Sequence, residues 1–409
     1  MKGIGKRICL VGLVAFFSCG SLNAYGQIKQ PSLGEVLSKP IKIERTAPVT
    51  EVAITLRSGK IYLQATIIDF AGEFVFDTGS PTILDQTVAE ELDLKIIGEN
   101  TGRDTNGNEV SMKIAVADSI TFGGTVFYDV PVMVHDSASV PLSKCYISNG
   151  VLGSELLPGS AWRLDLSQAS LKIASHINEL PALEGTKSTP LNLFGYPFAP
   201  IVDYSIGRYS DKALFDTGNA SEVALFADIE RDKWVRKEID PKTIEEGRGR
   251  LGTSAGGIGD VVPLKNFQIK ALSVGNYAIG RTQVQSRPIP PTLIGAGILK
   301  SHTVTLDYPN AQFLISPSAS PLVQKPHSGF ALTVNGDKVE VTQIFDASDA
   351  QKAGLLLGDK VVEINGSGLS VSTDTERCET SLWLSSEFDA GSVKTIKINR
   401  DDELIEIVF

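Results

Sequence analysis

The sequence is poor in the residues that build metal sites and disulfide frameworks. Its 409 residues include four cysteines, three methionines, three tryptophans and four histidines. The histidines show no metal-ligand spacing, so we expect no metal and no cofactor; they are His135, His176, His302 and His327. Beyond the N-terminus, no apolar run is long enough to cross a bilayer, so we expect no membrane span in the mature chain.

The four cysteines also argue against a disulfide framework. Cys9 and Cys19 lie in the N-terminal segment, whereas Cys145 and Cys378 are far apart in the chain. We expect the latter two to lie in different domains as separate buried thiols.

Positive charge is scarce as well. The formal net charge is −10, with 38 basic and 48 acidic residues, and the sequence shows no basic patch. This composition argues against a nucleic-acid partner.

The N-terminus has the pattern of an export signal. Lys2, Lys6 and Arg7 precede an apolar run over 8–17, and the small residues Ala24 and Gly26 follow. We expect residues 1–26 to be a signal peptide, which places the protein in the periplasm or outside the cell. Its removal would take the net charge from −10 to −13. A membrane anchor is the alternative, and lipid attachment at Cys19 is a weaker one.

Short apolar runs and turn residues dominate the rest of the chain. Thirty-eight glycines and 20 prolines separate segments rich in Val, Ile and Phe, which predicts a mainly β protein. The length suggests two or three domains.

An internal duplication organises residues 46–316. Apolar runs lead into Asp77-Thr78-Gly79-Ser80 and into Asp216-Thr217-Gly218-Asn219. A Gly-to-Asp spacing of 12 residues then recurs at 153–165 and 295–307. We therefore place one lobe at 46–178 and another at 188–316. A helix is expected after each turn, for example over 85–94.

Two such turns suit a particular chemistry. Two carboxylates held about 3 Å apart share one proton, so Asp77 and Asp216 could act as base and acid on a water and a carbonyl group. Gly79 and Gly218 allow the tight turns, and the Thr78 and Thr217 hydroxyls could lock one turn to the other. The alternative for each turn is a structural aspartate in a tight turn.

These motifs resemble the retropepsin and pepsin superfamily of aspartic peptidases. The resemblance implies two similar β lobes that form a cleft, with hairpin flaps near 101–112 and 250–262 that close over an extended peptide. Both halves lie in one chain, so a monomer would hold a complete dyad. Ser80 matches the small, often hydroxylic residue that follows the turn in this family and helps to orient the carboxylate. Asn219 departs from that pattern.

The end of the chain differs from the lobes. A Ser- and Pro-rich linker over 317–326 leads into residues 327–409, where Gly358-Asp359 and Ile364-Asn365-Gly366 resemble a PDZ domain, a small α+β fold. The resemblance implies that the loop over 328–332 binds protein C-termini; its members are Ser328, Gly329, Phe330, Ala331 and Leu332. The alternative is a domain that only packs against the rest.

The sequence thus predicts an exported aspartic endopeptidase with a domain for substrate recruitment or regulation. The alternative is a non-catalytic adaptor that binds peptides with the same folds.

Overall fold

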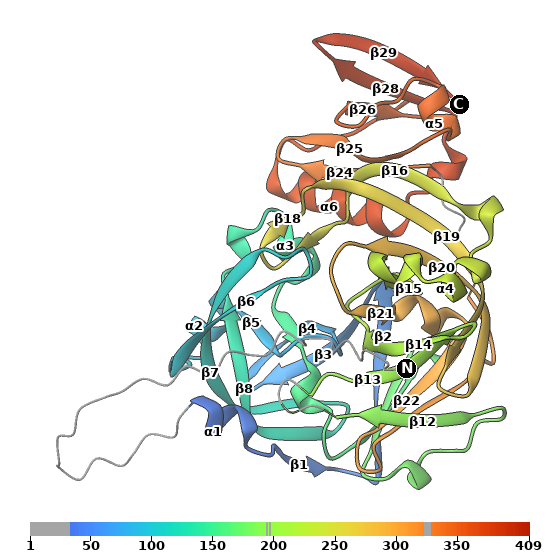
Figure 1. The fold of residues 1–409 in the computed structure, drawn as a ribbon. Coiled ribbons are helices and arrows are strands. Elements are labelled where there is room, and N and C mark those ends of the chain that lie inside the picture. Colours follow the sequence, from blue (N-terminus) through green and yellow to red (C-terminus); the bar gives the residue numbers. More distant parts are fainter. Residues whose placement is uncertain (1–32, 194, 196–197, 323–328) are drawn as a thin grey trace, which may run out of the picture.

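The computed structural model describes residues 33–193, 195, 198–322 and 329–409. The expected signal peptide, residues 323–326 of the expected linker and Ser328 lie outside the described residues. None of the described helices is both long and apolar enough to span a membrane. The fold is mainly β (Figure 1).

The first half of the molecule comprises residues 49–174. Helix α1 and strand β1 come before residue 49 and are given with this half. The strands are β1 (Lys42–Arg45), β2 (Val49–Arg57), β3 (Lys60–Ile67), β4 (Phe70–Phe76), β5 (Ile83–Asp85), β6 (Gly98–Arg103), β7 (Glu109–Phe122), β8 (Thr125–His135), β9 (Gly150–Leu152), β10 (Ala161–Asp165) and β11 (Ser170–Ala174). The helices are α1 (Leu33–Ser38), α2 (Gln86–Glu91) and α3 (Ser143–Tyr146). Helix α2 lies within the range expected after the first turn.

The second half, residues 187–317, has a similar series. Its strands are β12 (Lys187–Asn192), β13 (Ile201–Ile206), β14 (Tyr209–Asp216), β15 (Val223–Phe226), β16 (Glu245–Arg250), β17 (Thr253–Ser254), β18 (Gly257–Ile258), β19 (Val261–Val274), β20 (Tyr277–Arg287), β21 (Thr292–Gly295), β22 (His302–Asp307) and β23 (Gln312–Pro317), and its α-helix is α4 (Lys233–Glu238). Burial alternates along many strands. In β13, for instance, Val202, Tyr204 and Ile206 are buried while their neighbours are partly exposed.

The strand pairings of the first half recur in the second. Strand β4 pairs in parallel with β9, and β14 pairs in parallel with β21. Strand β5 lies between β8 and β9 in the same way that β15 lies between β20 and β21. The long hairpin β7–β8 corresponds to β19–β20. The duplicated motifs therefore sit at corresponding places in two copies of one topology.

The two halves are joined through the second-to-last strand of each. Strand β10 pairs antiparallel with β22, so that Trp162 lies opposite Leu306. One hydrophobic core contains residues of both halves. Aromatic rings pack behind each turn: Phe76 stacks on Trp162 with centroids 5.7 Å apart, and Phe215 meets Phe313 edge-on at 5.4 Å. These rings hold the strands that carry the two aspartates.

The C-terminal segment, residues 329–409, has a core of its own. It contains β24 (Phe330–Asn335), β25 (Lys338–Phe345), β26 (Lys360–Ile364), β27 (Ser367–Gly368), β28 (Thr395–Arg400), β29 (Glu403–Val408), α5 (Asp349–Lys352) and α6 (Asp374–Ser386). Strand β25 also pairs with β16, with Arg248 opposite Ile344. All described strands except the β17–β18 ribbon are therefore linked in one hydrogen-bonded network rather than in separate sheets.

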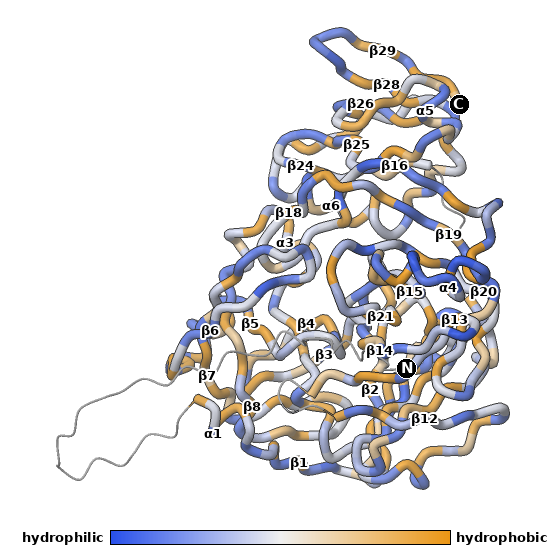
Figure 2. Tube along the Cα trace, viewed as in Figure 1, coloured by the Kyte–Doolittle hydropathy of each residue, from blue (hydrophilic) through white to orange (hydrophobic). Residues whose placement is uncertain are grey.

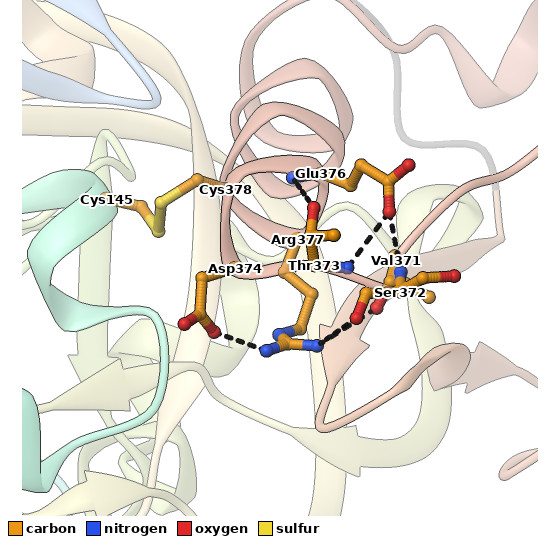
Figure 3. A network of polar contacts seen from close by, with 8 residues as sticks. All are labelled: Cys145, Val371, Ser372, Thr373, Asp374, Glu376, Arg377 and Cys378. Atoms are coloured by element: carbon orange, nitrogen blue, oxygen red, sulfur yellow. Dashed lines mark hydrogen bonds and ion pairs between the residues drawn. A yellow bond between two sulfur atoms is a disulfide. The ribbon is translucent and has the colours of Figure 1, made fainter.

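A disulfide makes the second connection to this segment. Cys145 in α3 is bonded to Cys378 in α6, with their Cα atoms 5.3 Å apart (Figure 3). The expectation of two separate thiols is wrong. Helix α6 lies against α3, and the Tyr146 hydroxyl donates a hydrogen bond of 2.9 Å to the Ser381 carbonyl oxygen. The 233-residue separation gives no sign of this docking.

Polar contacts fix the start of α6, one turn before the disulfide. The Thr373 hydroxyl accepts the Glu376 N–H at 3.2 Å, and the Glu376 carboxylate accepts the Thr373 N–H at 3.0 Å. This reciprocal cap satisfies two backbone donors that a helix start otherwise leaves open. Arg377 contacts Asp374 and the carbonyl oxygen of Val371 (Figure 3).

Candidate active site

Each aspartate stands at the end of a buried strand. Strand β4 ends at Phe76, one residue before Asp77, and β14 ends at Asp216 itself. The Asp77 N–H donates to the Leu152 carbonyl oxygen at 3.0 Å, and Asp216 pairs in register with Gly295. Leu152 and Gly295 belong to the segments whose repeat the sequence shows. Those segments therefore position the turns.

The two carboxyl groups lie side by side, each against the glycine of the opposite turn. A Cβ atom added to Gly79 would lie 2.6 Å from Asp216 Cγ, and one added to Gly218 would lie 2.1 Å from Asp77 Oδ2. No larger residue fits at either position. Within each turn the glycine N–H donates to the aspartate beside it, at 2.8 Å for Gly79 to Asp77 and 2.9 Å for Gly218 to Asp216.

Thr78 and Thr217 hold the turns together across the boundary between the halves. The Thr78 N–H donates to the Thr217 hydroxyl at 3.0 Å, and the Thr217 N–H donates to the Thr78 hydroxyl at 3.1 Å. Each hydroxyl in turn donates to the opposite strand, Thr78 to the Phe215 carbonyl at 2.7 Å and Thr217 to the Phe76 carbonyl at 2.8 Å. Both threonines are fully buried, so the four bonds are shielded from water.

The residues after the glycines do not reach the carboxylates. The Ser80 hydroxyl donates to the Pro81 carbonyl oxygen at 2.8 Å. The Asn219 side-chain oxygen accepts the Ser221 N–H at 3.0 Å and also contacts the Ser221 hydroxyl. The Asn219 side chain therefore shapes its own turn through Ser221.

Burial and charge act strongly on this pair. Burial first, and then the adjacent Asp77 carboxyl, raises the pKa of Asp216, which is only 6% exposed. The Gly218 N–H and the Lys60 cation act in the opposite direction. Such a site favours a pair that carries a single negative charge, with one proton shared between two carboxyls.

Two cations near Asp216 are not part of the sequence motifs. Lys60, at the start of β3, donates to the Gly218 carbonyl oxygen at 3.1 Å. Arg287, at the end of β20, is 8% exposed, and its charge interacts with that of Asp216. Neither belongs to a motif, so no sequence signal points to them.

The tips of two hairpins meet between the halves. The turn between β6 and β7 contacts the β17–β18 ribbon, and these segments lie in the ranges expected for flaps. The Asp104 carboxylate accepts one hydrogen bond from the Ser254 hydroxyl at 2.5 Å and another from the Gly256 N–H at 2.9 Å. The Asn106 amide donates to the Gly252 carbonyl oxygen at 3.2 Å. One bond between side chains and two between side chain and backbone thus bridge the two tips.

The expected peptide-binding loop lies at the start of β24. Gly329 has a φ of +82°, a conformation that favours glycine. The buried Phe330 ring stacks on the ring of the last residue, Phe409, with centroids 5.7 Å apart. Ala331 and Leu332 pair with Gln343 and Val341 of β25.

Comparison with known families bears on the first turn. Residues 63–156 match the aspartyl protease family. This aspartyl protease region runs from β3 past β9 and contains Asp77, Thr78 and Gly79, whereas Asp216 lies outside it. No curated protein matches the chain. The pairing of the second turn with the aspartyl protease region is therefore known from the geometry alone.

Proposed function

We propose that the protein is an aspartic endopeptidase whose dyad is formed by Asp77 and Asp216, with residues 46–178 and 188–316 as its lobes. The observation that carries the proposal is the reciprocal turn pair, in which each glycine contacts the opposite carboxyl and each threonine binds the opposite strand. The aspartyl protease match around Asp77 supports the same reading. Burying two carboxyls together opposes folding, which favours a functional reason for the arrangement.

The mechanism follows from a shared proton. The ionised carboxyl takes a proton from a water molecule, and that water attacks the peptide carbonyl carbon. The protonated carboxyl donates its proton to the carbonyl oxygen, which becomes the hydroxyl of a tetrahedral intermediate. When this intermediate collapses, the C–N bond breaks and the nitrogen receives a proton from one carboxyl. One hydroxyl of the intermediate returns its proton to the other carboxylate, so the second product leaves as a carboxylic acid and the dyad again holds one proton. The threonine bonds would hold the carboxyls in place throughout.

The test uses the mature protein and a mixed peptide library from about pH 3 to about pH 8. Asp77→Asn and Asp216→Asn keep the shape of each side chain but remove the shared proton chemistry. We expect cleavage by the wild type and a loss of at least about 1000-fold in both variants. Thermal unfolding of the variants checks that they fold. The absence of cleavage by the wild type, or equal cleavage by a folded variant, would exclude the peptidase.

We also propose that the C-terminal segment binds peptide C-termini in the manner of a PDZ domain. The glycine conformation at 329 and the position of α6 beside β24 support this. Peptides that differ only by C-terminal amidation should then bind with different affinity, and equal binding would contradict the proposal.

Export is proposed for the same chain. The N-terminal pattern supports it, and so does the Cys145–Cys378 disulfide, because disulfides persist in oxidising compartments. N-terminal sequencing of the protein purified from its native cells should give Gln27 as the first residue. An intact N-terminus in the cytosolic fraction would rule export out.

A further inference from the structure

A large open pocket lies on the second half and contains none of the turn residues. Its volume is about 730 Å3, within the range typical of small-molecule sites. It is formed where α4 and its flanking 3-10 helices, 227–231 and 241–243, meet β19. The lining residues are Ala227, Glu230, Arg231, Arg236, Lys237, Ile239, Pro241, Ile244, Lys265 and Lys270.

The pocket wall is strongly basic. Five of its ten residues are cationic and one is acidic, in a chain whose net charge is −10. Lys265 binds Glu230 at 3.0 Å, and Arg231 binds Asp228 at 3.1 Å. The other three cations of the wall form no ion pair with any carboxylate in the described part of the chain; they are Arg236, Lys237 and Lys270. At longer range Lys270 does act on a carboxylate: the pKa of Asp240 is lowered first by its hydrogen bond to Arg281 and to a smaller extent by the Lys270 charge.

The sequence shows no basic patch, but the fold forms one at this pocket. Lys265 and Lys270 come from β19, about thirty residues after α4, so the cluster exists only in the fold. Figure 2 shows the chain around α4 as hydrophilic. The Lys237 ammonium group also lies 4.6 Å from the centroid of the Trp234 ring, a cation–π contact.

The duplicated topology offers an internal comparison. Helix α2 follows β5 as α4 follows β15, yet α2 carries Glu90 and Glu91 and no basic residue. Helix α4 carries Lys233, Arg236 and Lys237. The shared fold therefore does not need positive charge at this place, and the cations call for another explanation.

We propose that this pocket binds a small organic anion that carries at least two negative charges, as phosphate or carboxylate groups, on an apolar body. The guanidinium groups of Arg231 and Arg236 can each bind such groups with two parallel hydrogen bonds, and the lysines act as point charges. Ala227, Ile239, Pro241 and Ile244 offer an apolar surface to the rest of the ligand. The site does not depend on peptidase activity.

Isothermal titration calorimetry on the full mature protein tests this. The probes are inorganic phosphate, inorganic pyrophosphate, and adenosine triphosphate as a multiply charged ligand with an apolar ring system. We expect saturable binding that strengthens in that order and weakens as salt rises. The double variant Arg236→Gln with Lys270→Gln should weaken triphosphate binding at least tenfold. Both side chains are exposed, so the variant should fold normally.

The matched control is Lys95→Gln, an exposed lysine of the first half that lines no part of the pocket. It should leave binding unchanged. The proposal is overturned if no probe binds, or if the control weakens binding as much as the double variant. Binding confined to a single-stranded oligonucleotide, or to vesicles containing phosphatidylglycerol, would also overturn it, because the surface would then serve a polymer or a membrane.

Discussion

Lys60 of the first half donates a hydrogen bond of 3.1 Å to the carbonyl oxygen of Gly218 in the turn of the second half. This places one cation beside the carboxyl pair, where it favours the charged form of Asp216. The second half has no lysine at the start of β13, the strand that corresponds to β3, since β13 begins at Ile201. The environment of the pair is therefore asymmetric even though its turns are nearly identical.

Lys60→Met should shift the pH profile of peptide cleavage toward higher pH. Without the cation, the carboxyl pair holds its protons to higher pH. The acidic and the basic side of the profile should therefore both move to higher pH, by about one pH unit at most. Lys60→Arg should restore the wild-type profile, because it keeps the charge. The measurement is kcat/KM against pH for one cleaved peptide. An unchanged pH profile in Lys60→Met would show that Lys60 does not influence the protonation of the carboxyl pair. Arg287 would then be the remaining candidate cation.

Thr217→Val should loosen the turn pair. The variant loses the hydroxyl that accepts the Thr78 N–H and donates to the Phe76 carbonyl oxygen, so each of these two buried groups loses a hydrogen bond. We expect a loss of about 2 to 5 kcal/mol in the free energy of unfolding and about 100-fold in kcat. Thr217→Ser should keep most of the wild-type stability and most of the wild-type kcat, because serine retains the hydroxyl. Urea unfolding and steady-state kinetics measure the two effects, and a Val variant as active as the Ser variant would contradict the role.

Glu155→Gln should change how stability depends on pH. Glu155 is fully buried, its Oε1 accepts the Thr82 N–H at 2.6 Å, and Oε2 has no hydrogen-bond partner among the residues that the structure describes. Burial raises its pKa from 4.5 to about 7. The folded state therefore keeps this proton to higher pH than the unfolded chain, and stability is lost as pH rises from about 4.5 to about 7.

Glutamine removes that loss and keeps the acceptor for Thr82. The variant should match the wild type near pH 4 and exceed it by about 3 kcal/mol near pH 8. Urea unfolding at both pH values is the measurement, with the exposed Glu91→Gln as control. Equal stability of variant and wild type at pH 8 would show that Glu155 is not destabilising there.

Cys378→Ser should weaken the attachment of the C-terminal segment. A native disulfide typically stabilises the folded state by about 2 to 4 kcal/mol, and this one joins residues 233 positions apart. Reduction of the wild type should lower its unfolding temperature as much as the substitution does, and reductant should have no further effect on the variant. A variant as stable as the oxidised wild type would mean that the helix contacts alone hold α6 on α3.

Ser254→Ala should release the hairpin tips from one another. The substitution removes the hydroxyl that donates a hydrogen bond of 2.5 Å to Asp104. The Gly256 N–H, which donates to the same carboxylate, should then exchange its hydrogen faster. Hydrogen exchange followed by mass spectrometry should show this increase in peptides covering 101–108 and 251–259. Asp118→Asn, an exposed change away from the tips, is the control. Unchanged exchange in Ser254→Ala would show that backbone contacts suffice.

The sequence predicts the parts of the site that depend on local pattern. The apolar runs before Asp77 and Asp216, the turn residues and the 12-residue repeat all describe short segments, and the fold places these segments together. The reciprocal bonds of Thr78 and Thr217 follow from the same symmetry.

Other features depend on contacts that no local pattern records. Lys60 and Arg287 are single residues that reach Asp216 only when distant strands pair. Cys145 and Cys378 meet because α6 docks on α3. Asn219 departs from the family pattern, and its side-chain oxygen accepts the Ser221 N–H, because a short polar side chain readily bonds to a nearby backbone donor.

The pairing of β16 with β25 has a practical consequence for dissecting the molecule. Strand β16 lies between β19 and β25, so a chain cut after residue 317 would leave one edge of β16 open. The uncovered stretch includes Gly247 and Gly249, which have no side chains to block an incoming strand. Open edges of this kind recruit strands from other molecules. A shortened protein should therefore self-associate, and polar substitutions along β16 would be needed before the duplicated part could be studied alone.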